Sequence, residues 1–219
     1  MEKVKYIFFD FDGTVSDAKK LTYETLLDIL DSMDFKFSRL KLKKMMGAKM
    51  PKILDEVGID GHLVDKIRKK FYNNLVKKSD LSKLKLCSDV KPLYDLKKEG
   101  VRLIVLSNAE KSFVEASIRA LGLEGLFYRV YGAHKSLTKD EVMKKLFKKF
   151  KINGKDVMYV GDRFSDMDYA HRAEMIAVAI HNDCSWSSLK EMIAEDPDFI
   201  IHDFDGLKEL YENFDKAGK

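Results

Sequence analysis

The sequence has few of the residues that cross-link or stiffen small secreted proteins. Its 219 residues include no glutamine, three prolines and two cysteines. Cys87 and Cys184 lie far apart, without CxxC spacing or a histidine at metal-ligand distance, so neither a disulfide framework nor a zinc site is indicated. We expect both to be reduced thiols. The missing glutamine, together with many lysines and glutamates, is weakly typical of heat-adapted organisms.

Long apolar runs are also absent. The first apolar run, Tyr6-Ile7-Phe8-Phe9, stops at Asp10 and is too short for the core of a signal peptide. No other run approaches the roughly 20 residues of a membrane helix. We therefore expect a cytoplasmic protein that has no membrane partner. At 45% hydrophobic residues, the chain is long enough to bury a core without disulfides or structural metals.

The sequence has no large excess of charge of one sign. It has 40 Lys and Arg against 36 Asp and Glu, a net charge of +4, which is far below the clustered excess of a dedicated nucleic-acid binder. The charges are unevenly distributed, because residues 15–87 hold 17 basic and 10 acidic side chains while the remainder holds 23 and 26. A basic segment thus accompanies an acidic one. Nothing in the composition indicates an oligomeric state.

Short runs rich in β-branched and aromatic residues alternate with longer amphipathic stretches, a pattern typical of βαβ units. The predicted strands are Val4 to Phe9, Val101 to Leu106, Phe127 to Tyr131, Val157 to Val160, Ile176 to Ile180 and Phe199 to Ile201. Helices are predicted over 112–121 and 140–150, each short enough for a right-handed crossover. The fold class is therefore α/β, with a Rossmann-like parallel sheet as its core.

Residues 15–87 break this alternation. Apolar residues recur there at helical spacing, as in Leu26, Leu27 and Leu30, and no convincing strand is found. We predict an α-helical cap domain over 15–87, inserted into an α/β core domain made of residues 1–14 and 88–219.

Polar residues follow three of the predicted strands, where open parallel sheets bind their ligands. Asp10, Asp12 and Thr14 follow the first strand, Ser107 and Asn108 follow the second in the chain, and Asp162 and Asp166 follow Val160. Four carboxylates at one sheet edge would repel each other without a cation, and an oxygen-only ligand set favours Mg²⁺. A lysine should complete a phosphoryl-transfer site, and Lys139 is a better candidate than Lys135 because it starts a predicted helix.

These residues, in this order, resemble the four motifs of the haloacid dehalogenase-like (HAD) hydrolase superfamily, and the chain is most similar to its phosphoglycolate-phosphatase-like group. The motifs are Asp10-Phe-Asp-Gly-Thr14, Ser107-Asn108, Lys139 and Gly161-Asp162 with Asp166. The resemblance implies a Mg²⁺-dependent phosphatase that hydrolyses a small phosphorylated metabolite, phosphoglycolate-like or sugar-phosphate-like, through an aspartyl-phosphate. The basic cap would then steer such anions toward the cleft.

The resemblance also implies a role for each residue. Asp10 would be the nucleophile and Asp12 the general acid and base. The metal would be held by Asp10, Asp162 and the main-chain carbonyl of Asp12, while Asp166 would bind it through a water molecule or orient Asp162. Phosphate oxygens would be bound by Thr14, Ser107, Asn108 and Lys139.

Several alternatives stay open. A phosphomutase of the β-phosphoglucomutase kind would use the same core, and a non-catalytic module resembling a receiver domain would also group acids, a hydroxyl and a lysine. Ser107 and Glu110 have the spacing of a capping box. Asp203-Phe204-Asp205-Gly206 repeats the letters of the first motif without its threonine, and Asp205 is predicted to be a helix N-cap. Lys49, in a loop-like part of the cap, could reach an anionic group of a substrate.

Overall fold

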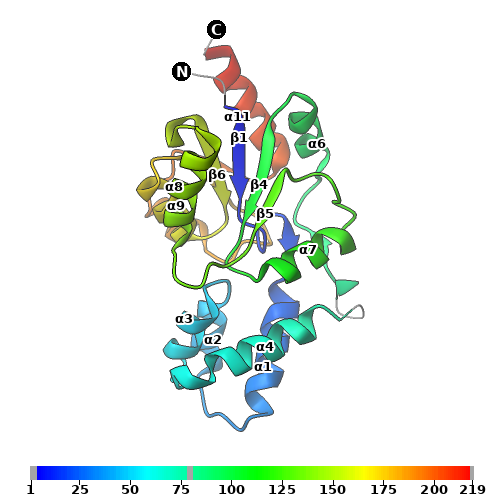
Figure 1. The fold of residues 1–219 in the computed structure, drawn as a ribbon, viewed down its shortest axis with the longest axis vertical. Coiled ribbons are helices and arrows are strands. Elements are labelled where there is room, and N and C mark those ends of the chain that lie inside the picture. Colours follow the sequence, from blue (N-terminus) through cyan, green and yellow to red (C-terminus); the bar gives the residue numbers. More distant parts are fainter. Residues whose placement is uncertain (1–3, 78–80, 218–219) are drawn as a thin grey trace.

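A six-stranded parallel sheet forms the centre of the protein, in a computed structural model that describes residues 4–77 and 81–217 (Figure 1). The strand order is β5-β4-β1-β6-β7-β8. The strands are β1 (Tyr6–Phe9), β4 (Arg102–Leu106), β5 (Arg129–Tyr131), β6 (Val157–Gly161), β7 (Ile176–Ile180) and β8 (Phe199–Ile201). Each matches a strand expected from the sequence, so the predicted α/β class is confirmed.

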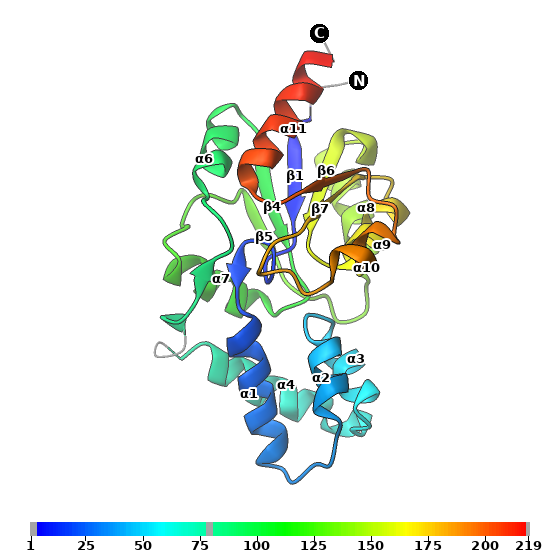
Figure 2. The same cartoon turned by 180° about the vertical axis from the view of Figure 1, so that it is seen from behind.

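Helices cover both faces of the sheet because side chains alternate along each strand. Phe8 points to the face where its ring meets Phe147, 6.2 Å away between centroids, and Phe9 points to the other, 6.1 Å from Phe204. Figures 1 and 2 show α8 and α9 on one face and α6 and α11 on the other. The helices of this part are α6 (Lys91–Lys98), α7 (Lys111–Ala120), α8 (Lys139–Phe150), α9 (Phe164–Arg172), α10 (Leu189–Ile193) and α11 (Phe204–Ala217), with a short 3₁₀ helix, η2 (Gly154–Asp156).

The register of the strands determines how far along the strand direction each of the polar residues lies. Phe9 pairs with Val105 of β4 on one side and with Val160 of β6 on the other. Because the three strands run parallel, Asp10 leaves β1 at the level at which β4 and β6 end. The residues after these strands therefore meet at one edge of the sheet.

Beyond this edge lie the helices of residues 15–87, which we call the helical insert (Figure 1). They are α1 (Lys19–Asp31), α2 (Arg39–Met45), α3 (Met50–Glu56), η1 (Gly61–Leu63) and α4 (Val64–Leu75). Their apolar faces, together with Phe113 and Ala116 of α7, form a hydrophobic cluster that is distinct from the two clusters that flank the sheet. No helix of the described residues is long and apolar enough to cross a membrane.

Two strands that the sequence did not suggest join the insert to the sheet. β2 (Ser16–Asp17) and β3 (Lys85–Leu86) pair antiparallel, so the chain leaves and returns at one place. The expectation of no strand within 15–87 was wrong. A strand of two residues is too short to show a periodic pattern in the sequence. Each of these two strands forms only because its distant partner pairs with its main-chain hydrogen-bonding groups.

The expectation of two reduced thiols was also wrong. Cys87, just after β3, and Cys184, in the loop after β7, form a disulfide with their Cα atoms 5.7 Å apart. The bond ties the return path of the helical insert to the loop 181–188. Disulfides are typical of oxidising compartments, but intracellular proteins of hyperthermophiles also contain them.

Breaking this disulfide should destabilise the fold. It closes a loop with a sequence separation of 97 residues, for which loop-closure entropy predicts a loss of about 4–5 kcal/mol in the free energy of unfolding on reduction. Urea denaturation with and without a reductant measures this. Cys87→Ser, Cys184→Ser and the double variant should be equally destabilised, since each lacks the same bond. An unfolding midpoint that does not respond to reductant would contradict the prediction.

Candidate active site

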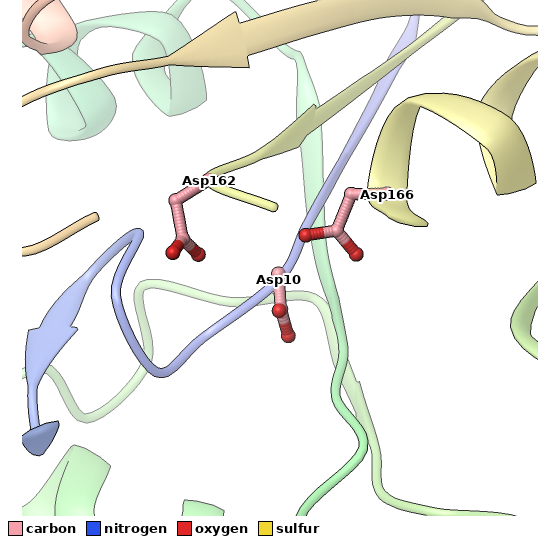
Figure 3. A group of neighbouring side chains, drawn as sticks. All are labelled: Asp10, Asp162 and Asp166. Carbon is pink, nitrogen blue, oxygen red and sulfur yellow. The ribbon is translucent and has the colours of Figure 1, made fainter. Parts of the chain in front are cut away.

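Three carboxylates meet at the edge of the sheet. Asp10 follows β1, Asp162 follows β6, and Asp166 lies in the first turn of α9; Figure 3 shows them around a common space. One oxygen from each lies within 4.8 Å of the others, and all three side chains are buried. Gly161 allows this approach, because a Cβ there would stand only 2.5 Å from that of Asp166. The structure therefore brings together three of the acids predicted from the sequence.

A buried lysine lies among these acids. The Nζ atom of Lys139 is 3.1 Å from Oδ1 of Asp10 and 2.7 Å from Oδ1 of Asp166, and it also donates to the hydroxyl of Tyr159 at 2.8 Å. Lys139 is the first residue of α8, whose N-terminus is fixed by a capping box between Thr138 and Glu141. Lys135 is exposed. Of these two lysines, Lys139 is thus the one that lies among the acids, and its role in phosphate binding stays a prediction.

Burial and mutual repulsion shift the pKa values of the clustered acids. Burial raises the pKa of Asp10 to about 6, although the charge of Lys139 lowers it. Burial, and then the charges of Asp10 and Asp166, hold the pKa of Asp162 well above its usual range. Burial alone would lower the pKa of Lys139, but Asp10 and Asp166 reverse this and raise it. The lysine therefore stays charged and offsets part of the negative charge of the acids.

Asp12 lies apart from this cluster, on the cavity side. Burial, followed by the charge of Asp10, raises its pKa to about 8, so its carboxyl group holds a proton near neutral pH. Its Oδ1 atom is buried without a hydrogen-bond partner among the described residues. Its main-chain carbonyl, expected as a metal ligand, accepts a hydrogen bond of 3.1 Å from the indole of Trp186. That carbonyl has a second lone pair, so its predicted role stays a prediction.

Asp162 is fixed from two sides. It accepts a hydrogen bond from the hydroxyl of Thr14 at 2.9 Å and another from the main-chain N–H of Trp186 at 2.7 Å. Thr14, expected to bind phosphate, thus positions an acid here. Gly13 has a φ of 96°, and a Cβ at this position would overlap both Asp162 and Trp186. No sequence pattern predicts the contacts of Trp186, because its loop is distant in the chain.

Ser107 and Asn108 face the same edge from the end of β4. The Ser107 hydroxyl accepts from the N–H of Ala109 at 3.0 Å, and α7 begins only at Lys111 with Glu110 as its N-cap. Ser107 therefore does not cap the helix, and the capping-box reading was wrong. The Asn108 amide donates to the carbonyl of Gly47 in the helical insert at 3.3 Å.

A cavity of about 40 Å³ lies between the sheet edge and the insert, with room for about three water molecules. Asp10, Asp12, Ser107 and Asn108 line its floor. The loop around Gly47 contacts the sheet edge beside the cavity through the hydrogen bond from Asn108. Arg163, which the sequence did not single out, contributes a guanidinium that donates to the carbonyl of Met46.

The fold and the geometry together define an enzyme of the α/β class, with its site at the carboxyl edge of a parallel sheet. A family model of haloacid dehalogenase-like hydrolases matches residues 7–180. The chain belongs to this family.

Similar proteins agree with this family. A protein of Caldanaerobacter subterraneus subsp. tengcongensis, provisionally named pyrophosphatase PpaX, is 24% identical over a 221-residue alignment that covers 98% of this chain and 97% of that protein. A phosphoglycolate phosphatase of Synechococcus elongatus is 28% identical over 111 residues, half of each chain. The crystal structure of a predicted phosphatase from Clostridium acetobutylicum has a TM-score of 0.84 at 19% identity, covering 97% of this chain and all of its own, and so shows the shared fold.

Proposed function

We propose that this hydrolase is a Mg²⁺-dependent phosphatase that acts on a small phosphorylated metabolite. The observation that carries the proposal is the pair Asp10 and Asp12 on the floor of the cavity, with Asp10 beside a buried lysine and Asp12 buried next to it. Burial raises the pKa of Asp12 to about 8, which suits a general acid. The names of the two relatives support phosphate chemistry. The helical insert would serve as the cap, and a cytoplasmic location remains part of the proposal.

The reaction would take place in two steps. A carboxylate oxygen of Asp10 attacks phosphorus, the bond from phosphorus to the alcohol oxygen breaks, and Asp12 gives its proton to the leaving alcohol. Water then attacks the aspartyl-phosphate while Asp12 takes up a proton. The bond from phosphorus to Asp10 breaks and phosphate leaves. Lys139 offsets the negative charge that gathers on the phosphoryl oxygens.

The residues present fit a hard divalent cation. Asp10, Asp162 and Asp166 offer only oxygen atoms, and three carboxylates with one lysine leave negative charge to be balanced. When bound, Mg²⁺ would supply charge stabilisation to a phosphoryl oxygen. Thr14 and Trp186 hold Asp162 for this purpose, and Tyr159 with the main-chain N–H of Arg163 holds Asp166.

A mutase of the β-phosphoglucomutase kind would use the same groups, but it would keep the phosphorylated intermediate bound and turn it before a second transfer. Phosphate release into solution at high turnover would agree with a phosphatase.

Metal removal tests the proposal. Hydrolysis of 4-nitrophenyl phosphate should need Mg²⁺, fall at least about 100-fold with a chelator and return when Mg²⁺ is added back. Mg²⁺ should also raise the melting temperature, because it binds only the folded site. This increase should be larger at pH 8 than at pH 5, since carboxylates bind metal in their ionised form. Full activity in the chelator would contradict the proposal.

A further inference from the structure

The wall of the cavity that faces Asp10 and Asp12 is apolar. It is formed by Met50, Ile53, Phe71, Leu75 and Phe113, which we call the apolar wall, and each of these side chains is at most 6% exposed. Among the described residues that line the cavity, none is a lysine, an arginine or a histidine. A leaving group held between the floor and this wall would meet hydrocarbon.

The cations of the insert nearest the cavity have other partners. Lys49 donates to the main-chain carbonyls of His134, at 3.2 Å, and Leu137. Arg68 pairs with Asp65 at 2.8 Å and with Glu110 of the sheet domain at 3.4 Å. Both line an outer recess rather than the cavity. These contacts hold the helical insert against the core. Because Lys49 is engaged in them, the arrangement does not favour the expected contact between Lys49 and an anionic group of the substrate.

The hydroxyl groups that the insert brings to the cavity are engaged with the main chain. Thr22 donates to the carbonyl of Ala18 at 2.7 Å, and the Tyr72 hydroxyl accepts a hydrogen bond from the N–H of Glu110. An anion at the apolar wall would lose its hydration and meet the Tyr72 O–H as the one side-chain donor that the insert offers among the described residues lining the cavity. A sugar with many hydroxyls would leave most of them unpaired. A hydrocarbon group is stabilised when it is buried against the wall, and each buried methylene should raise kcat/KM by about fourfold.

We propose that the substrate is a phosphate monoester whose alcohol is uncharged and rich in hydrocarbon next to the phosphate. This inference rests on the proposed phosphatase function and narrows its substrate class. It predicts that neither phosphoglycolate nor pyrophosphate is the preferred substrate, because each of these molecules would place a second anion against the apolar wall.

The test compares three substrates of the Mg²⁺-loaded enzyme by phosphate release. n-Butyl phosphate should exceed both phosphoglycolate and inorganic pyrophosphate in kcat/KM by at least about tenfold. If either anion is hydrolysed as well as the butyl ester or better, the inference is wrong. The measurement needs no variant, so it does not depend on the folding of a mutant.

A variant tests the wall itself. Met50→Lys should raise the ratio of phosphoglycolate to butyl phosphate in kcat/KM by at least about tenfold, because it brings an ammonium group to the cavity. Met50→Leu, which keeps the site neutral at similar volume, should leave that ratio within about twofold. An unchanged ratio in a folded Met50→Lys protein would also overturn the inference.

The two proposals can fail separately. If 4-nitrophenyl phosphate is hydrolysed in a reaction that requires Asp10, but the anions are preferred, only the substrate inference fails. If no ester is hydrolysed, the phosphatase proposal fails and the inference fails with it.

Discussion

Replacing Asp10 with asparagine should lower kcat for 4-nitrophenyl phosphate by at least about 10⁴-fold while the protein stays folded. The amide has nearly the same shape, but it lacks the negative charge and nucleophilicity that the proposed attack on phosphorus needs. The substitution also removes one of the three carboxylates that are proposed to bind the metal. Phosphate release measures the rate, and thermal unfolding confirms the fold.

The chain offers a matched control for this substitution. Asp203 begins the second Asp-Phe-Asp-Gly run, yet it is exposed and accepts a hydrogen bond from the N–H of Gly206 at 2.9 Å in the first turn of α11. Asparagine can cap a helix equally well, so Asp203→Asn should keep full activity. A folded Asp10→Asn variant with the wild-type rate would refute the role of Asp10 as nucleophile. The capping contact also corrects the sequence expectation, which assigned the cap to Asp205.

Lys139→Met should lower kcat/KM by about 10²–10³-fold. Its ammonium group lies within 3.1 Å of Asp10 and 2.7 Å of Asp166, both buried. Methionine keeps the volume of the stem but leaves these carboxylates without their positive neighbour. We expect the variant to be less stable, because removing one member of a buried ionic group is costly. Steady-state kinetics and urea denaturation measure the two effects.

Lys135→Met is the control for Lys139→Met. It makes the same chemical change four residues away at an exposed position, so it should change both quantities little. If Lys135→Met lowered kcat/KM more than Lys139→Met did, the assignment of the phosphate lysine would have to be reversed.

The sheet and most of the acidic site could be predicted because their signals are local. Each strand is a short apolar run, and the rule that ligands lie beyond the carboxyl ends of parallel strands then places Asp10, Asp162 and Asp166 at one edge. Lys139 could be chosen because helix starts leave a sequence signature. These inferences need only the residues around each motif and the order of the motifs.

The features that were missed depend on contacts between distant segments. The disulfide forms because β3 and the loop after β7 lie close together, and the spacing of the two cysteines in the sequence does not predict this. Trp186 matters through hydrogen bonds to Asp12 and Asp162, 174 and 24 residues away. Arg163 holds a carbonyl of the helical insert. In each case the chemistry of the side chain is ordinary, and only the fold gives it a role.

The position of β1 in the middle of the sheet affects the order of events during synthesis. β1 is complete at Phe9, but its neighbours β4 and β6 begin only at Arg102 and Val157. At about 5–20 residues per second, its hydrophobic residues wait about 5–20 s after they are made before the first neighbour exists. The helices of the insert are made during this interval, and most of their hydrophobic cluster is then available to pack. On the ribosome, the helical insert can therefore begin to fold before the parallel sheet can form.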